Sequence, residues 1–133
     1  MISVREFLYQ GRGLKLEIEE LKSARQKAYD LACSTSPKKD GEDKSSVETK
    51  YANYAEYSAM IDKRIEELSI YRKKMLDIIN KIPDTTYRTL LISRYINCET
   101  WEKVAETIGY SDVWVRTNLH SKALTEANKF FVE

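Results

Sequence analysis

Apolar side chains recur every three or four residues through most of the 133-residue chain, a spacing that predicts helices rather than strands. The most regular run extends from about Ser46 to Lys81, where steps of four and three alternate and only two of the eleven positions are polar. Its positions are Val47, Tyr51, Tyr54, Ser58, Ile61, Ile65, Leu68, Arg72, Met75, Ile79 and Ile82. This is the pattern of a coiled-coil seam, so it predicts one long helix that packs against a partner.

A narrower apolar stripe precedes this run and predicts a first helix from about Ser3 to Ala32. The stripe consists of Phe7, Leu14, Ile18, Leu21 and Ala28. Glycine lowers helix propensity, so we expect Gly11-Arg12-Gly13 to weaken or bend this helix.

The segment between the two helices, Ser34 to Ser46, contains Pro37, Gly41 and a mixed run of charges. It has too little apolar surface to order itself, which predicts a flexible connector. At about 1.5 Å per residue the two helices are about 45 and 53 Å long. We therefore expect an antiparallel coiled-coil hairpin over residues 1–82, with the connector at 34–46.

The second helix carries more apolar surface than one narrow partner helix can cover. Beside its seam lie Tyr57, Ile70, Tyr71, Leu76 and Ile78. A continuous exposed apolar surface is typical of an interaction site. Either the C-terminal part covers it near Ile78, or a second copy does so in a four-helix arrangement, and we expect a homo-oligomer.

Residues 83–133 predict three shorter helices. Pro83 cannot continue a helix and Asp84 can cap a new one, so a helix begins near Thr85. Its inward positions are Tyr87, Leu90, Leu91 and Tyr95. The segment Asn97-Cys98-Glu99 interrupts this pattern and ends the helix.

The last two helices meet at Gly109-Tyr110-Ser111. Thr100 is a suitable N-cap for the first of them, and Gly109 suits the left-handed residue that ends it. Ser111 is a suitable cap for the next helix. The buried faces are Trp101, Val104, Ala105 and Ile108 in the first, and Val115, Leu119, Ala123, Ala127 and Phe130 in the second. Two short helices joined by such a turn are typical of a helix-turn-helix.

The segment from Thr100 to Ser111 resembles region 4 of sigma-70-type transcription factors, whose pattern is W-x-x-[IV]-A-x-x-[LI]-G-[YV]-S. Over nearly the whole chain, the sequence also resembles the ArpU-like phage transcriptional regulators. In that family a charged helical part, a Ser-rich break and a second long helix precede the motif. The corresponding residues here are Ile82-Pro83-Asp84 and Tyr87-Arg88-Thr89-Leu90-Leu91. The resemblance implies an all-α fold with a C-terminal helix-turn-helix domain at 83–133.

In this family the third helix of the motif reads the major groove, which implies a set of DNA-contacting residues. Base-edge candidates are Trp114, Arg116 and Thr117, with Arg116 the strongest. Thr100 and Ser111 offer helix N-termini to phosphates. Positive charge comes from Arg94, Lys103 and Lys122.

The chain departs from the family in one respect. In many relatives a Leu-His pair follows the cap Ser by seven and eight residues, whereas Leu119 and His120 follow Ser111 by eight and nine. Either Asp112 is the true cap, or the recognition helix has a different register. We expect His120 to be a half-exposed helix residue, with contact to a phosphate or base as the alternative. Trp101 is expected in the core, whereas for Trp114 core and surface stay open.

Charge modifies the DNA interpretation. The whole chain has a formal net charge of +1, and residues 83–133 carry six Lys or Arg against seven Asp or Glu. Nonspecific DNA affinity comes mainly from neutralising phosphates, so an isolated copy of this slightly acidic segment is expected to bind weakly. Tight binding then requires two copies or a partner.

Other classes of function find little support. We expect no enzyme, because the sequence has neither a phosphate-binding glycine loop nor a nucleophile elbow. No metal or cofactor is expected either, since Cys33, Cys98 and the single histidine have no zinc-site spacing. The sequence shows no signal peptide and no apolar run of membrane-spanning length, so we expect a protein of the bacterial host's cytoplasm.

Two functions therefore remain. The first is a phage or prophage DNA-binding transcriptional regulator that reads double-stranded promoter DNA or docks on RNA polymerase. The second is a structural or assembly adaptor, such as a DNA-recognition subunit of phage packaging. The acidic motif region modestly favours the adaptor.

Overall fold

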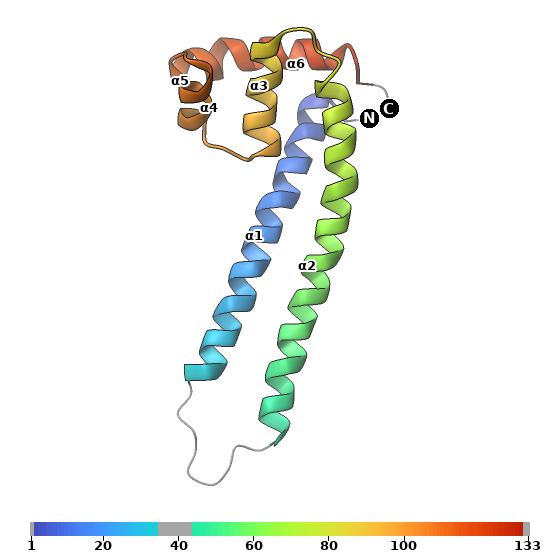
Figure 1. Ribbon diagram of the computed structural model, residues 1–133, viewed down its shortest axis with the longest axis vertical. Coiled ribbons are helices and arrows are strands. Elements are labelled where there is room, and N and C mark those ends of the chain that lie inside the picture. Colours follow the sequence, from blue (N-terminus) through green and yellow to red (C-terminus); the bar gives the residue numbers. More distant parts are fainter. Residues whose placement is uncertain (1, 35–43, 132–133) are drawn as a thin grey trace. The chain divides into compact units, whose positions relative to one another are not determined.

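The computed structural model describes residues 2–34 and 44–131, and it is all-helical over these residues. Two long helices come first, α1 (Val4–Ser34) and α2 (Lys44–Ile79). The C-terminal helices follow as α3 (Thr85–Leu91), η1 (Ile92–Ile96), α4 (Trp101–Ile108), α5 (Asp112–Trp114), η2 (Val115–Leu119) and α6 (His120–Asn128) (Figure 1). The predicted all-α class is confirmed. Residues 35–43, which make up most of the expected connector, lie outside the described residues.

The C-terminal elements combine into three continuous helices. The π-helical turn η1 directly extends α3, and α5, η2 and α6 follow one another without a break. With α1 and α2, the described residues thus form the five predicted helices.

The chain divides into two compact units, and both long helices contribute to each. Unit 1 comprises Met1–Lys15 and Leu68–Glu133, and unit 2 comprises Leu16–Glu67. The ends of α1 and α2 therefore belong to the same compact unit as the helix-turn-helix, although the sequence suggested a division at residue 83.

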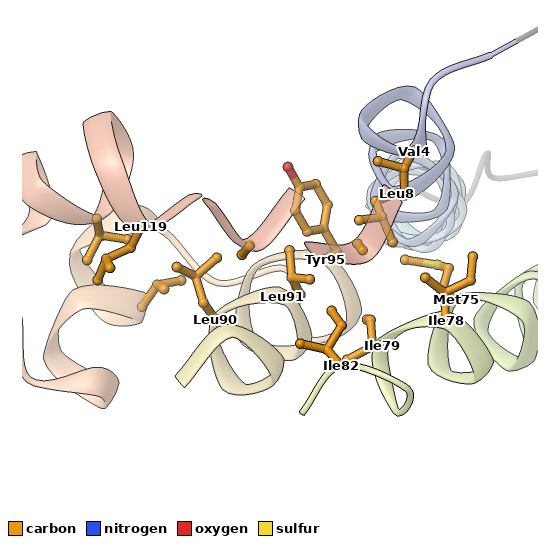
Figure 2. Close-up of a cluster of buried hydrophobic side chains, with 14 of the residues drawn as sticks. Val4, Leu8, Met75, Ile78, Ile79, Ile82, Leu90, Leu91, Tyr95 and Leu119 are labelled. Atoms are coloured by element: carbon orange, nitrogen blue, oxygen red, sulfur yellow. The ribbon is translucent and has the colours of Figure 1, made fainter. Parts of the chain in front are cut away.

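Unit 1 contains the main hydrophobic core. Val4 and Leu8 of α1 pack with Met75, Ile78, Ile79 and Ile82 from the end of α2 and with residues of the C-terminal helices (Figure 2). The C-terminal residues in this core are Leu90, Leu91, Tyr95, Val104, Ala105, Val115, Leu119, Ala123 and Ala127. The predicted inward faces of the C-terminal helices are thus confirmed, with Tyr87, Trp101, Ile108 and Phe130 partly buried against the core.

Helix α1 is continuous at the glycines that were expected to weaken or bend it. The helix runs through Gly11 and Gly13, and Gly11 is buried at its contact with α2. A Cβ at this position would overlap the Met75 side chain and approach Tyr71, whereas a Cβ at Gly13 would meet nothing within 4 Å. Gly11 therefore allows the close approach of two helices.

Unit 2 is a two-helix segment with few buried apolar side chains. Among its described residues, the buried hydrophobic ones are Ile18 and Ile61. Polar contacts join the helices: Arg64 Nε lies 2.9 Å from Glu17 Oε1, and Arg25 Nη1 donates to Ser58 Oγ at 3.0 Å. The pairing is antiparallel, because residues later in α1 meet residues earlier in α2.

The predicted seam of α2 holds in part. Ile61, Leu68, Met75, Ile79 and Ile82 are buried as expected. Burial of Tyr51, Tyr54 and Ile65 was a wrong expectation, since all three are exposed. A single helix, α1, lies against α2 here and covers these side chains only in part: even Tyr54, whose ring meets Tyr29 and Arg25 of α1, stays 43% exposed.

Candidate nucleic-acid interface

Local capping groups set where the helices of the helix-turn-helix begin and end. Thr100 Oγ1 accepts a hydrogen bond from the Lys103 amide at 3.3 Å and so caps α4. Gly109 ends α4 with φ of 80°, in the left-handed region that glycine adopts without strain. The predicted caps and the predicted turn are confirmed.

Ser111 is the cap of the third helix, so the alternative that Asp112 is the cap is wrong. Its Oγ accepts from the Trp114 amide at 3.2 Å. Asp112 is instead the first residue of α5, and its Oδ2 lies 3.4 Å from Arg116 Nη2.

The wide turn η2 sets the register of the third helix. In this π-helical turn the His120 amide bonds to the carbonyl of Val115, five residues earlier, so the turn contains one residue more than an α-helical turn. Leu119 therefore still faces the core, even though it follows Ser111 by eight residues. A single wide turn absorbs the extra residue.

The base-edge candidates lie on the exposed side of this helix. Trp114 is 45% exposed, and Arg116 and Thr117 are exposed. The Thr117 hydroxyl donates to the carbonyl of Val113 at 2.6 Å, and Arg116 pairs with Asp112 on the helix surface. The open question about Trp114 is thus resolved in favour of the surface.

Val113 is exposed as well, at 59%, and sequence reasoning did not single it out. Its position directly before Trp114 in the first turn was the available signal. The first turn therefore presents two adjacent apolar side chains beside the arginine.

The remaining surface candidates are well separated in the chain but all accessible. Thr100, Lys103, Ser111 and Lys122 are exposed. The hydroxyls of Thr100 and Ser111 are already used as caps, whereas Lys103 and Lys122 present their charges to solvent.

His120 is buried, so the expectation of a half-exposed residue is wrong. It is 8% exposed, and its Nε2 lies 2.6 Å from the Tyr95 hydroxyl. Its ring also meets the edge of Trp101, with 4.7 Å between ring centroids. The ring points inward because the wide turn η2 brings both Leu119 and His120 to the core. Burial, with the nearby charges of Arg5 and Arg94, lowers the pKa of His120 to about 4. Contact with a phosphate or base was suggested for a ring at the surface, and this ring is buried.

Arg94 is also tied to the structure of the motif. Its Nη1 donates to the Glu99 carbonyl at 2.9 Å, and its guanidinium lies 4.2 Å from the centre of the Trp101 ring. Burial and, next, the charge of Arg12 lower the pKa of Arg94. Trp101, half-buried between Arg94 and His120, packs against the core as expected.

The structural unit that contains the motif is more basic than residues 83–133 alone. Unit 1 contains thirteen Lys or Arg and nine Asp or Glu, a net charge of +4. Unit 2 contains nine and twelve, a net charge of −3. The ends of α1 and α2 thus supply basic residues that a count over residues 83–133 leaves out.

Comparison with protein-family models, with curated proteins and with solved structures gave no match. Among the described residues, no helix is both long enough and apolar enough to cross a membrane. The motif residues and their geometry are therefore the basis of the functional proposal.

Proposed function

We propose that this chain is a phage-type transcriptional regulator whose sigma-region-4-like helix-turn-helix binds promoter DNA. The observation that carries the proposal is the third helix, which is capped by Ser111 and presents Trp114, Arg116 and Thr117 to solvent in its first two turns. A helix that enters a major groove contacts base edges with these N-terminal positions.

The exposed side chains suit different parts of a DNA duplex. Arg116 can donate two hydrogen bonds to guanine, or one or two to a phosphate. Trp114 offers an apolar surface to a thymine methyl group. Lys103 and Lys122 add positive charge for phosphate contacts that position the helix without reading sequence.

A second copy of the chain is the partner that best fits unit 2. Its apolar side chains are largely exposed, including Leu16, Tyr29, Leu31, Tyr51, Tyr54, Met60 and Ile65. Two helices with so little buried surface gain stability when another layer covers them.

The charge distribution of unit 2 favours an antiparallel pair of copies. Residues 16–21 and 61–67 carry six acidic and two basic side chains, whereas residues 22–31 and 49–60 carry four basic and two acidic ones. Antiparallel packing places the acidic part of one copy beside the basic part of the other, a complementary arrangement. Such a dimer also supplies the two DNA-binding units that tight binding requires.

Selection of bound sequences from randomised double-stranded DNA, at low and at physiological salt, tests this function. The proposal expects an enriched motif with the full-length protein, alone or with RNA polymerase. Absence of any enriched motif under all these conditions favours the packaging adaptor instead.

A further inference from the structure

Three arginines from different helices of unit 1 meet at the loop that joins η1 to α4. Arg72 of α2 donates from Nη2 to the Ile96 carbonyl at 2.9 Å, and Arg94 of η1 donates from Nη1 to the Glu99 carbonyl at 2.9 Å. Arg12 of α1 is held at the same loop, where the Cys98 thiol lies 3.9 Å from its backbone carbonyl. Arg12, Arg72 and Arg94 are called the arginine cluster below.

The loop itself has an unusual backbone. Cys98 has a φ of 57°, the one positive value at a non-glycine position in the part of the chain that the structure describes. Residues other than glycine adopt this region rarely, and strained backbone of this kind is frequent at ligand sites. The three arginines therefore surround a sharply turned segment rather than a regular helix surface.

The positive charges of the cluster are not balanced by acids nearby. Within residues 2–31 and 51–131, none of the three guanidinium groups forms an ion pair with a carboxylate. The hydrogen bonds of Arg72 and Arg94 go to backbone carbonyls, which carry only partial charges. Two of the charges also act on each other, because burial and then the charge of Arg12 lower the pKa of Arg94.

Arg12 contains a buried donor without an acceptor. Among the described residues, its Nε is one of two buried side-chain N or O atoms that have no hydrogen-bond partner. Buried polar groups in folded proteins nearly always have a partner, so an unpaired donor can mark the site of an ion. A guanidinium is the group best suited to hydrogen-bond a phosphate through two parallel donors.

We propose that the arginine cluster binds a phosphate group and that, in the complex proposed above, this group is a backbone phosphate of double-stranded DNA. The phosphate chemistry follows from the cluster alone, whereas the source of the phosphate rests on the proposed function. The phosphate reaches the cluster through the side chain of Arg12, which is partly exposed, and neutralises the neighbouring charges. DNA then contacts the ends of α1 and α2 in addition to the helix-turn-helix.

Arg12→Gln is the most direct test, because Arg12 Nε has no hydrogen-bond partner among the described residues that the substitution would remove. We expect DNA affinity to fall about three- to tenfold, equally for the selected site and for unrelated DNA, and the log–log salt slope to decrease by about one. Lys74→Gln is the matched control, since it removes one exposed charge from the same unit. It should change affinity less than about twofold at physiological salt, where separated surface charges are screened.

A second measurement separates the two sources of phosphate. Millimolar inorganic phosphate, at matched ionic strength, should raise the thermal midpoint of the full-length protein but not that of Arg12→Gln, since a ligand of the native state stabilises it. If phosphate stabilises the protein but the protein binds no DNA, the phosphate site stands and its assignment to DNA is overturned. If the protein binds DNA specifically and Arg12→Gln and Lys74→Gln change the affinity equally, the cluster is not a phosphate site. The proposed function is then left intact.

Discussion

His120 lies where a charged imidazole is strongly disfavoured. Tyr95 and Trp101 enclose its ring, Arg5 and Arg94 add positive charge nearby, and its pKa falls to about 4 from an ordinary value of 6.5. The folded state therefore holds the ring neutral at pH values where the unfolded chain already binds a proton. Stability linked to this residue is complete above about pH 6.5 and is lost as the pH falls toward 4.

We predict that acidification from pH 7 to pH 4.5 destabilises the protein partly through His120. The shift of about 2.5 pKa units corresponds to at most about 3 kcal/mol of unfolding free energy at the acid end. His120→Gln has no group that titrates in this window, so its stability should vary less with pH. Urea unfolding of both proteins across this pH range gives the unfolding free energy of each. Subtracting one curve from the other removes the contribution of the carboxylates, which the two proteins share. Parallel curves for the two proteins would show that His120 is not buried as a neutral ring.

Sequence reasoning at the residue scale succeeded where the cause is local and failed where it is not. Arg116 borders the apolar stripe and reaches outward along its long side chain, and Thr117 lies farther from the stripe, so local spacing explains the exposure of both. The burial of His120 depends on Tyr95 and Trp101 from other helices and on a wide turn that spacing rules based on 3.6 residues do not contain.

At the scale of elements, two glycines of α1 have opposite surroundings two residues apart. Gly11 faces Met75 and Tyr71 of α2, whereas the space around Gly13 is open. A leucine side chain at Gly11 must displace a buried methionine, while one at Gly13 extends into solvent and improves helix propensity.

We predict that Gly11→Leu lowers the unfolding free energy by about 1 to 3 kcal/mol, the usual range for overpacking. Gly13→Leu should instead raise it by up to about 1 kcal/mol, because leucine replaces glycine in an exposed helix position. Chemical denaturation of the matched pair provides the measurement. Equal effects of the two substitutions would contradict the close contact between α1 and α2 at Gly11.

The helix ends were predictable from sequence because capping depends on one side chain and the next few amides. Asp84, Thr100 and Ser111 each accept a hydrogen bond from the amide three residues later, as their residue types indicate. The exposure of Tyr51, Tyr54 and Ile65 in the α2 seam was not predictable in this way. Burial of a seam residue depends on how many helices cover it, which a heptad pattern does not specify.

At the scale of the whole molecule, the two units differ in charge and in how much apolar surface they bury. Unit 1 is basic and has a continuous core, whereas unit 2 is acidic and leaves most of its apolar side chains exposed. This division suits a DNA-binding unit joined to an assembly unit.

Substitutions at Ile65 and Leu68 distinguish the assembly of the chain from its folding. Ile65 is 43% exposed and Leu68 is 6% exposed, although both belong to the same apolar stripe. We predict that Ile65→Asp converts a dimer into a monomer that keeps its helical content, with a lower thermal midpoint because the stabilising second copy is lost. Leu68→Asp should lower the stability of the chain itself by about 2 kcal/mol or more, since it buries a carboxylate in place of a leucine.

Light scattering with chromatography gives the mass, and circular dichroism gives the midpoint. An unchanged dimer mass for Ile65→Asp contradicts assembly through unit 2. A ring of eight or more copies of the unmodified protein supports the packaging adaptor over a promoter-binding dimer.

The central claim is tested most directly by measuring the affinity of the full-length protein for its best selected DNA site. The measurement is made with Arg116 and then with alanine at that position. Arg116 lies in the first turns of the exposed helix, where Asp112 is its only ion-pair partner among the described residues. We predict that Arg116→Ala weakens binding by about 1 to 3 kcal/mol and relaxes sequence preference. Lys129→Ala, on an ion-paired residue beyond α6, should change the affinity much less. Equal and small effects of the two substitutions, or no sequence preference at low salt with or without RNA polymerase, would contradict DNA reading by this helix.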